Sequence, residues 1–108
     1  MIIGVTIHKG LTAYSPWFPR MGNAATFAGE CIGVSGATNT ITIQTKNESD
    51  TDSSATDKTP TLALSSAGVQ TGRVTDLKEL VRFKYVVTGT NNYDWIHFRM
   101  LPPAWENN

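Results

Sequence analysis

Two runs in the last third of the chain decide its fold class: residues 76–87 read DLKELVRFKYVV, and residues 94–105 read DWIHFRMLPPAW. In both runs, bulky apolar residues alternate with charged or polar ones. The residues between the runs, 88–93 (TGTNNY), are rich in turn formers. This alternation is typical of antiparallel strands that bury one face and expose the other. The two runs therefore predict a pair of adjacent antiparallel strands in an all-β domain.

Shorter runs of the same kind recur along the chain, and sustained helical spacing does not. They predict strands at 1–7, 25–34, 40–46, 61–64 and 69–74, with a hairpin turn at 35–39. About seven or eight short strands at this spacing favour an antiparallel two-sheet β-sandwich, immunoglobulin-like or jelly-roll-like. Alternation on each strand predicts the core: Phe27, Ile41, Ile43, Leu62, Phe83, Tyr85, Val87, Ile96, Phe98 and Met100.

The same alternation assigns side chains to faces on two strands. On 25–34 it places one set of residues opposite Phe27, namely Ala28, Glu30, Ile32 and Val34. On 40–46 it turns the polar residues Thr42, Gln44 and Lys46 toward water. Residues 47–60 contain no large apolar residue, and they are therefore predicted to form a mobile loop.

Length and composition predict a single domain over residues 1–108, with extended terminal segments at about 10–24 and 101–108. Nine basic residues balance nine acidic ones, so no excess of positive charge favours nucleic-acid binding. No apolar run is long enough to cross a membrane, and the first residues lack the pattern of a signal peptide. We therefore expect synthesis in a cytoplasm and no membrane partner.

The residues that commonly carry chemistry do not form a recognisable motif. Asp50 and Asp52 have the spacing of a calcium loop, but Ala55 and Thr61 occupy its glycine and bidentate glutamate positions. The chain has only two histidines and one cysteine, Cys31, which is too few for an ordinary zinc site. Cys31 is expected to pack as a small hydrophobic residue. The sequence predicts no catalytic, metal or cofactor site.

Aromatic residues beside prolines are the strongest binding signal. Prolines bracket Trp17 and Phe18 and precede Trp105, and such rigid aromatics lose little entropy on docking. Seven residues are candidates for a protein interface: Trp17, Phe18, Arg20, Met21, Pro102, Pro103 and Trp105. A carbohydrate platform formed by Trp95 beside Arg99 is the alternative, because aromatic faces also stack on sugar rings.

The runs 72–85 (GRVTDLKELVRFKY) and 95–105 (WIHFRMLPPAW) resemble small β-sandwich virion proteins of tailed bacteriophages, over roughly residues 15–105. That resemblance implies a capsid decoration (cement) protein in the virion, made in the host cytoplasm. It also implies binding to the major capsid protein and to other copies of the chain, possibly as a trimer, and no enzymatic activity. A small tail component that forms rings is a further alternative.

Overall fold

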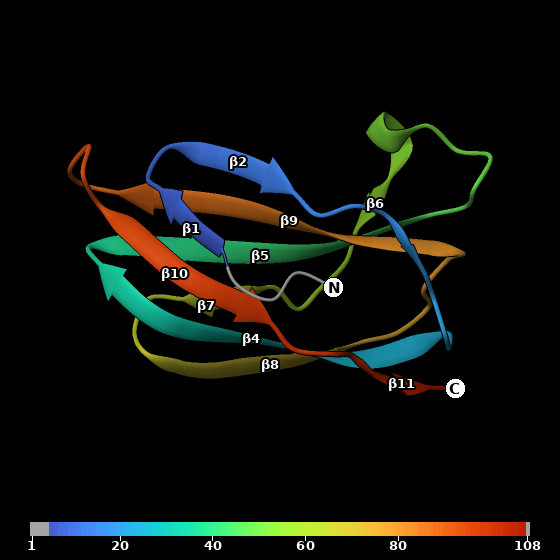
Figure 1. The fold of residues 1–108 in the computed structure, drawn as a ribbon. Coiled ribbons are helices and arrows are strands. Elements are labelled where there is room, and N and C mark those ends of the chain that lie inside the picture. The colour runs from blue at the N-terminus through green and yellow to red at the C-terminus, as the bar shows by residue number, and fades with distance from the viewer. Residues whose placement is uncertain (1–4, 108) are drawn as a thin grey trace.

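The computed structural model describes residues 5–107 (Figure 1). Residues 1–4 of the predicted first strand and residue 108 of the predicted terminal segment lie outside this range. The described chain forms eleven strands and a single 3-10 turn, η1 (Asp52–Ser54). The strands are β1 (Val5–His8), β2 (Leu11–Tyr14), β3 (Phe18–Pro19), β4 (Ala24–Ser35), β5 (Ala37–Lys46), β6 (Thr56–Asp57), β7 (Leu62–Leu64), β8 (Gly68–Val74), β9 (Leu80–Gly89), β10 (Trp95–Met100) and β11 (Ala104–Glu106).

These strands form two antiparallel sheets packed face to face, which confirms the predicted all-β sandwich. In the first sheet β4 pairs with β8 on one edge and with β10 and β11 on the other, and β1 pairs with β10. In the second sheet β9 pairs with β5 and with β2 and β3, while β6 and β7 share the outer edge of β5. Each sheet therefore has four strand positions.

Three of these positions hold two short strands each, because the chain is interrupted between them. Pro16 interrupts β2 and β3, and Pro102 and Pro103 interrupt β10 and β11, since proline cannot donate to a strand ladder. Counted by position along the chain, the first sheet runs 1-8-3-6 and the second runs 2-7-4-5. That is the strand order of a jelly roll, which decides between the two topologies that the sequence left open.

The predicted hairpins are wrong. β9 and β10 are not hydrogen-bonded to each other, because β9 lies in the second sheet and β10 in the first. β4 and β5 are likewise in different sheets, and Gly36 alone carries the chain from one to the other. Alternation indicates which face of a strand is buried, but it does not indicate which strand lies beside it, so strands that are sequential in the chain need not be neighbours in a sheet.

Three crossings between the sheets, β1–β2, β4–β5 and β9–β10, meet at Asp94. In Figure 1 these connections lie at the left end of the sandwich. The buried carboxylate of Asp94 accepts hydrogen bonds from the backbone N–H groups of Thr90 (2.9 Å) and Asn91 (2.8 Å). Its backbone carbonyl accepts one from Lys9 (3.1 Å), in the turn between β1 and β2. A Cβ atom on Gly36 would lie 2.6 Å from the Asp94 carboxylate. Asp94 therefore ties together all three crossings.

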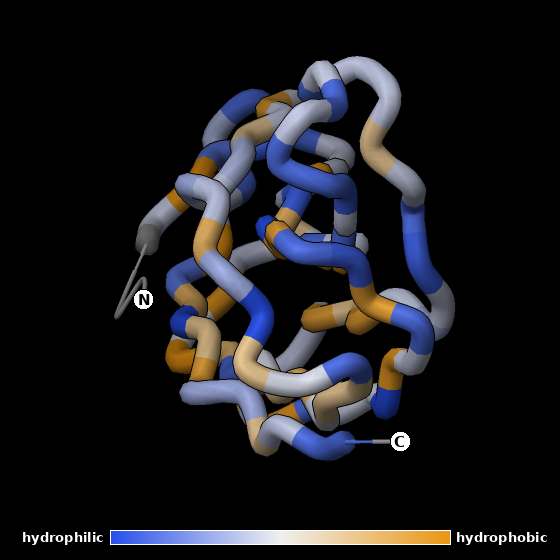
Figure 2. The backbone as a smooth tube through the Cα atoms, turned by 90° about the vertical axis from the view of Figure 1, so that its right-hand side faces the viewer, coloured by the Kyte–Doolittle hydropathy of each residue, from blue (hydrophilic) through white to orange (hydrophobic). Residues whose placement is uncertain are grey.

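All ten predicted core residues are buried. Phe83 lies at the centre of the aromatic part of the core, with ring centroids 5.3 Å from Phe18, 5.8 Å from Phe27 and 6.4 Å from Tyr85. Figure 2 shows hydrophobic and hydrophilic residues alternating along the strands that enclose this core. Two buried polar groups have no hydrogen-bond partner among residues 5–107: the side-chain amide of Asn39 and the hydroxyl of Tyr85.

The face predicted for Val34 is wrong because β4 contains a bulge. The pairing with β10 passes from His97 opposite Gly33 to Phe98 opposite Cys31, which leaves Ile32 as an extra residue. An extra residue reverses the alternation beyond it. Ile32 is therefore 49% exposed, whereas Val34 packs against the core.

The outer face of β5 also differs from prediction. Gln44 and Lys46 are buried and do not face water. The cover comes partly from residues 47–60, which are anchored to the sheet: Asp57 and Thr56 pair with Gln44 and Thr45 in β5. The sequence pattern missed this because the anchors of the segment are polar groups and not apolar side chains.

Candidate functional site

The most elaborate group of polar and aromatic side chains lies on the outer face of the second sheet. We call it the cation–aromatic cluster; it consists of Tyr14, Trp17, Lys46, Asp52 and Arg82. These residues come from β2, the β2–β3 connection, β5, η1 and β9. The topology of the sheet thus brings together residues that are up to 68 positions apart in the sequence.

Arg82 is held between two aromatic rings. Its guanidinium carbon lies 4.1 Å from the ring centroid of Tyr14 and 4.5 Å from that of Trp17. Its Nε donates a 2.8 Å hydrogen bond to the side-chain carbonyl of Gln44, the residue opposite it on β5. The side chain is only 12% exposed. Cation–aromatic contact is strongest where water is excluded, as it is here.

Lys46 is the second cation, with a side chain 9% exposed. Its ammonium group lies 4.9 Å from the Trp17 ring centroid. It donates hydrogen bonds to the Asp52 carboxylate (2.8 Å) and to the backbone carbonyl of Asp50 (2.9 Å). Trp17 Nε1 donates to the same Asp52 oxygen at 3.1 Å. These contacts, led by the hydrogen bond from Lys46, hold the pKa of Asp52 below its ordinary value.

The position of Trp17 follows from the residues before it. Ser15 is fastened to β9, because its N–H donates to the Phe83 carbonyl (2.9 Å) and its hydroxyl accepts from the Phe83 N–H (2.8 Å). Pro16 follows at once and cannot continue the ladder. The chain therefore leaves the sheet edge at Trp17, whose ring lies over the cations of the outer face.

The structure gives two of the predicted interface aromatics an intramolecular role. Phe18 and Trp105 are half-buried against the core, with ring centroids 6.4 Å apart. Trp105 also lies 6.0 Å from Phe27 in an edge-on arrangement. Both residues thereby hold the segments around them onto the sandwich.

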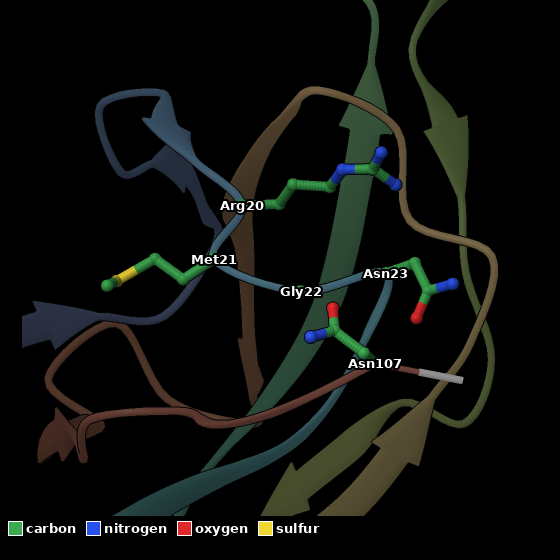
Figure 3. A pocket seen from close by; sticks show the side chains of 5 residues that line it. All are labelled: Arg20, Met21, Gly22, Asn23 and Asn107. Atoms are coloured by element: carbon green, nitrogen blue, oxygen red, sulfur yellow. The ribbon is translucent and has the colours of Figure 1, made fainter.

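Arg20 and Met21 lie where those two segments meet. The backbone N–H of Arg20 donates to the Glu79 carbonyl (3.0 Å), and its guanidinium donates to the Leu77 carbonyl. Met21 is 76% exposed, and in Figure 3 it points away from Arg20. Gly22 contacts the backbone of Glu106 so closely that a Cβ atom would collide with it. A shallow depression here is lined by Arg20, Met21, Gly22, Asn23 and Asn107 (Figure 3).

The structure does not bring all the predicted interface residues into one site. Pro102 is exposed and Pro103 is half-buried, in the connection between β10 and β11. Trp17 belongs to the cation–aromatic cluster on the sheet face. Only Arg20 and Met21 line the depression, with Phe18 and Trp105 supporting the two segments from beneath.

The other candidates are placed as follows. Trp95, His97 and Arg99 share the outer face of β10, and Arg99 pairs with Glu30 at 2.6 Å. The Trp95 ring lies over Gly33, where a Cβ would be 3.4 Å away, so this ring also has a packing role. Cys31 is buried, and burial raises the pKa of its thiol. Asp50 accepts a hydrogen bond from the Asn47 N–H (3.0 Å).

Sequence reasoning missed Tyr14, Lys46 and Arg82 as members of a site. Charged residues at outward positions of β5 and β9 look like ordinary solvent-facing residues, and only the register shows that they meet. A signal was nevertheless present. Three polar residues at alternate outward positions, Gln44, Lys46 and Arg82, lie on central strands where proline-bracketed Trp17 offers an aromatic cover.

Comparisons of the chain with models of protein families, with curated proteins and with solved structures found no match. Over residues 5–107, no helix is long and apolar enough to cross a membrane. In that same range, no three histidine, cysteine, aspartate or glutamate side chains converge as a metal site would require.

Proposed function

We propose that this chain is a non-enzymatic virion structural protein of a tailed bacteriophage, a capsid decoration protein that binds the major capsid protein and its own copies. The proposal is supported chiefly by the surface around Met21. Residues 18–23 and 105–107 come from opposite ends of the sequence and pack against each other there. Both segments are immobilised on the sandwich, by Phe18 and Trp105 below and by Arg20 at the side.

Such a surface suits docking because little backbone entropy remains to be lost. The backbone is already fixed, and Met21 presents a largely exposed apolar side chain at its centre. Methionine is also enriched at protein interfaces. We assign the role of docking anchor to Met21, with Arg20 and Asn107 as its polar surround.

The experiment uses heads assembled from the major capsid protein encoded in the same genome. Wild-type chain is expected to cosediment with these heads, and Met21→Asp is expected to lose most of that binding. Tyr93→Asp is the matched control, because Tyr93 is 87% exposed and lies in the β9–β10 loop at the other end of the sandwich (Figure 1). Equal binding by both variants, or no binding by wild type, would refute the proposal. Ring formation without head binding would favour a tail component.

Carbohydrate binding is the second candidate, and one observation favours it. Tyr14 is 49% exposed and lies beside Arg82, whose partner Gln44 also bonds to Asp57 at 2.7 Å. An exposed ring beside hydrogen-bonding side chains is a common arrangement for a sugar. A glycan array would decide: hits that disappear in Tyr14→Ala, from a chain that stays monomeric, would support this candidate over the first.

A further inference from the structure

The cation–aromatic cluster contains two nearly buried cations and a single carboxylate paired with them. Lys46 and Arg82 are 9% and 12% exposed, and Asp52 is the acidic side chain within ion-pair distance of both. Asp52 itself is 61% exposed. The positive charge is therefore fixed in the sheet, while its counter-charge is supplied from outside the sheet.

The guanidinium of Arg82 is only partly used. Its Nε bonds to Gln44, but its Nη1 lies 3.8 Å from Asp52, which is beyond hydrogen-bond distance. Among residues 5–107, no hydrogen bond involves either Nη group of Arg82. Guanidinium groups bind carboxylates most strongly through two parallel N–H···O bonds. Arg82 thus retains hydrogen-bonding capacity that Asp52 does not use.

Asp52 is the member of the cluster that lies in the 3-10 turn. It lies in η1, where no residue is buried, so moving it away exposes no apolar core. The displacement would break the bonds of Asp52 to Lys46 and Trp17. An incoming carboxylate can replace both of these bonds, and the local charge would stay the same. Such an exchange avoids leaving either cation buried without a counter-charge.

We propose that the cluster is a carboxylate-binding site that Asp52 occupies as an internal ligand, and that an acidic segment of a partner protein displaces Asp52 on docking. The rings of Trp17 and Tyr14 flank the Arg82 guanidinium, and Lys46 supplies the second positive charge. This inference rests on the proposed role in protein assembly, and it concerns a surface separate from that around Met21.

The test titrates a hexaglutamate peptide into the full chain. The NMR signals of the Trp17 indole N–H and the Arg82 Nε–H report binding. In Asp52→Ala the site is vacant, so saturable shifts of both signals are expected. If Asp52 occupies the site in more than about nine molecules in ten, wild type should bind at least about tenfold more weakly. Hexaglutamine is the uncharged control peptide.

Two further variants, each made in the Asp52→Ala chain, separate a site from general attraction. Arg82→Gln should abolish the shift at Trp17, whereas Lys84→Ala should retain it, because Lys84 is a cation on the same strand outside the cluster. Each variant must give the backbone NMR spectrum of a folded protein. If Arg82→Gln does not fold, Trp17→Phe takes its place. This variant keeps an aromatic ring but removes the N–H donor, so it should weaken peptide binding.

The inference is overturned if Asp52→Ala shows no saturable shift, if hexaglutamine binds equally, or if Arg82→Gln and Lys84→Ala weaken binding alike. It is also overturned if oligogalacturonate binds and hexaglutamate does not, which would indicate a site for acidic sugars. None of these outcomes affects cosedimentation with heads through Met21, so the two proposals can fail separately.

Discussion

Gly36→Ala is expected to destabilise the domain because two separate costs fall on this position. Gly36 has φ +74°, a left-handed conformation that costs an L-residue about 1–2 kcal/mol. The new Cβ would also lie 2.6 Å from the Asp94 carboxylate, which is held in place by the N–H groups of Thr90 and Asn91. Such overpacking typically costs about 1–3 kcal/mol. Together the two costs predict a loss of about 2–5 kcal/mol.

Two other glycines separate these costs. Gly10 has φ +77° with nothing within 4 Å of its missing Cβ, so Gly10→Ala should lose only about 1–2 kcal/mol. Gly89→Ala would place its Cβ 2.8 Å from the Asp94 carboxylate without a positive φ, so it should show the steric cost alone. Urea unfolding of the three variants measures the differences. Equal losses in Gly36→Ala and Gly10→Ala would refute the role of Asp94 as the common anchor of the crossings.

Three further predictions concern stability. Backbone hydrogen bonds, that from Asn91 first, hold the pKa of Asp94 below its ordinary 3.8. Because the pKa of Asp94 is lower in the folded state than in the unfolded state, its carboxylate stabilises the fold above about pH 4, and this contribution is lost as the pH drops toward the folded pKa. Between pH 6 and pH 2.5, the urea unfolding midpoint should therefore fall less in Asp94→Asn than in wild type. Phe83→Ala should lower the free energy of unfolding by about 3–5 kcal/mol in the same assay. A loss below about 1 kcal/mol would mean that the ring is not in the core. Asn39→Leu should stabilise by about 1–3 kcal/mol, since its buried amide is unpaired; destabilisation would indicate a partner for it.

The core was predictable from the sequence because it depends on alternation within each strand. Phe83, Tyr85 and Val87 occupy every second position of β9, and all three are buried as the pattern requires. The fold class follows from the same signal. The bulge at Ile32 was not predictable in this way. The sequence of β4 is the same whether or not its pairing with β10 skips one residue, but the skip reverses the faces of the residues that follow.

The alternation within each strand predicts neither which strands pair nor which residues form the cation–aromatic cluster. Both depend on contacts between residues far apart in the chain, such as Gln44 with Arg82 across β5 and β9. In the sequence, Asp52 is noticeable only for its calcium-loop spacing from Asp50, and the residues around it do not complete such a loop. Its actual partners are Lys46 and Trp17, and nothing in its neighbouring sequence identifies them.

The most direct test of the proposed function is electron cryo-microscopy of heads that carry the bound chain. The proposal predicts jelly-roll density on the outer capsid surface, with the end formed by residues 18–23 and 105–107 facing the shell. It also predicts the β9–β10 loop, at the opposite end of the sandwich, pointing outward. Heads without added density, or density docked through the β9–β10 loop, would contradict the proposal.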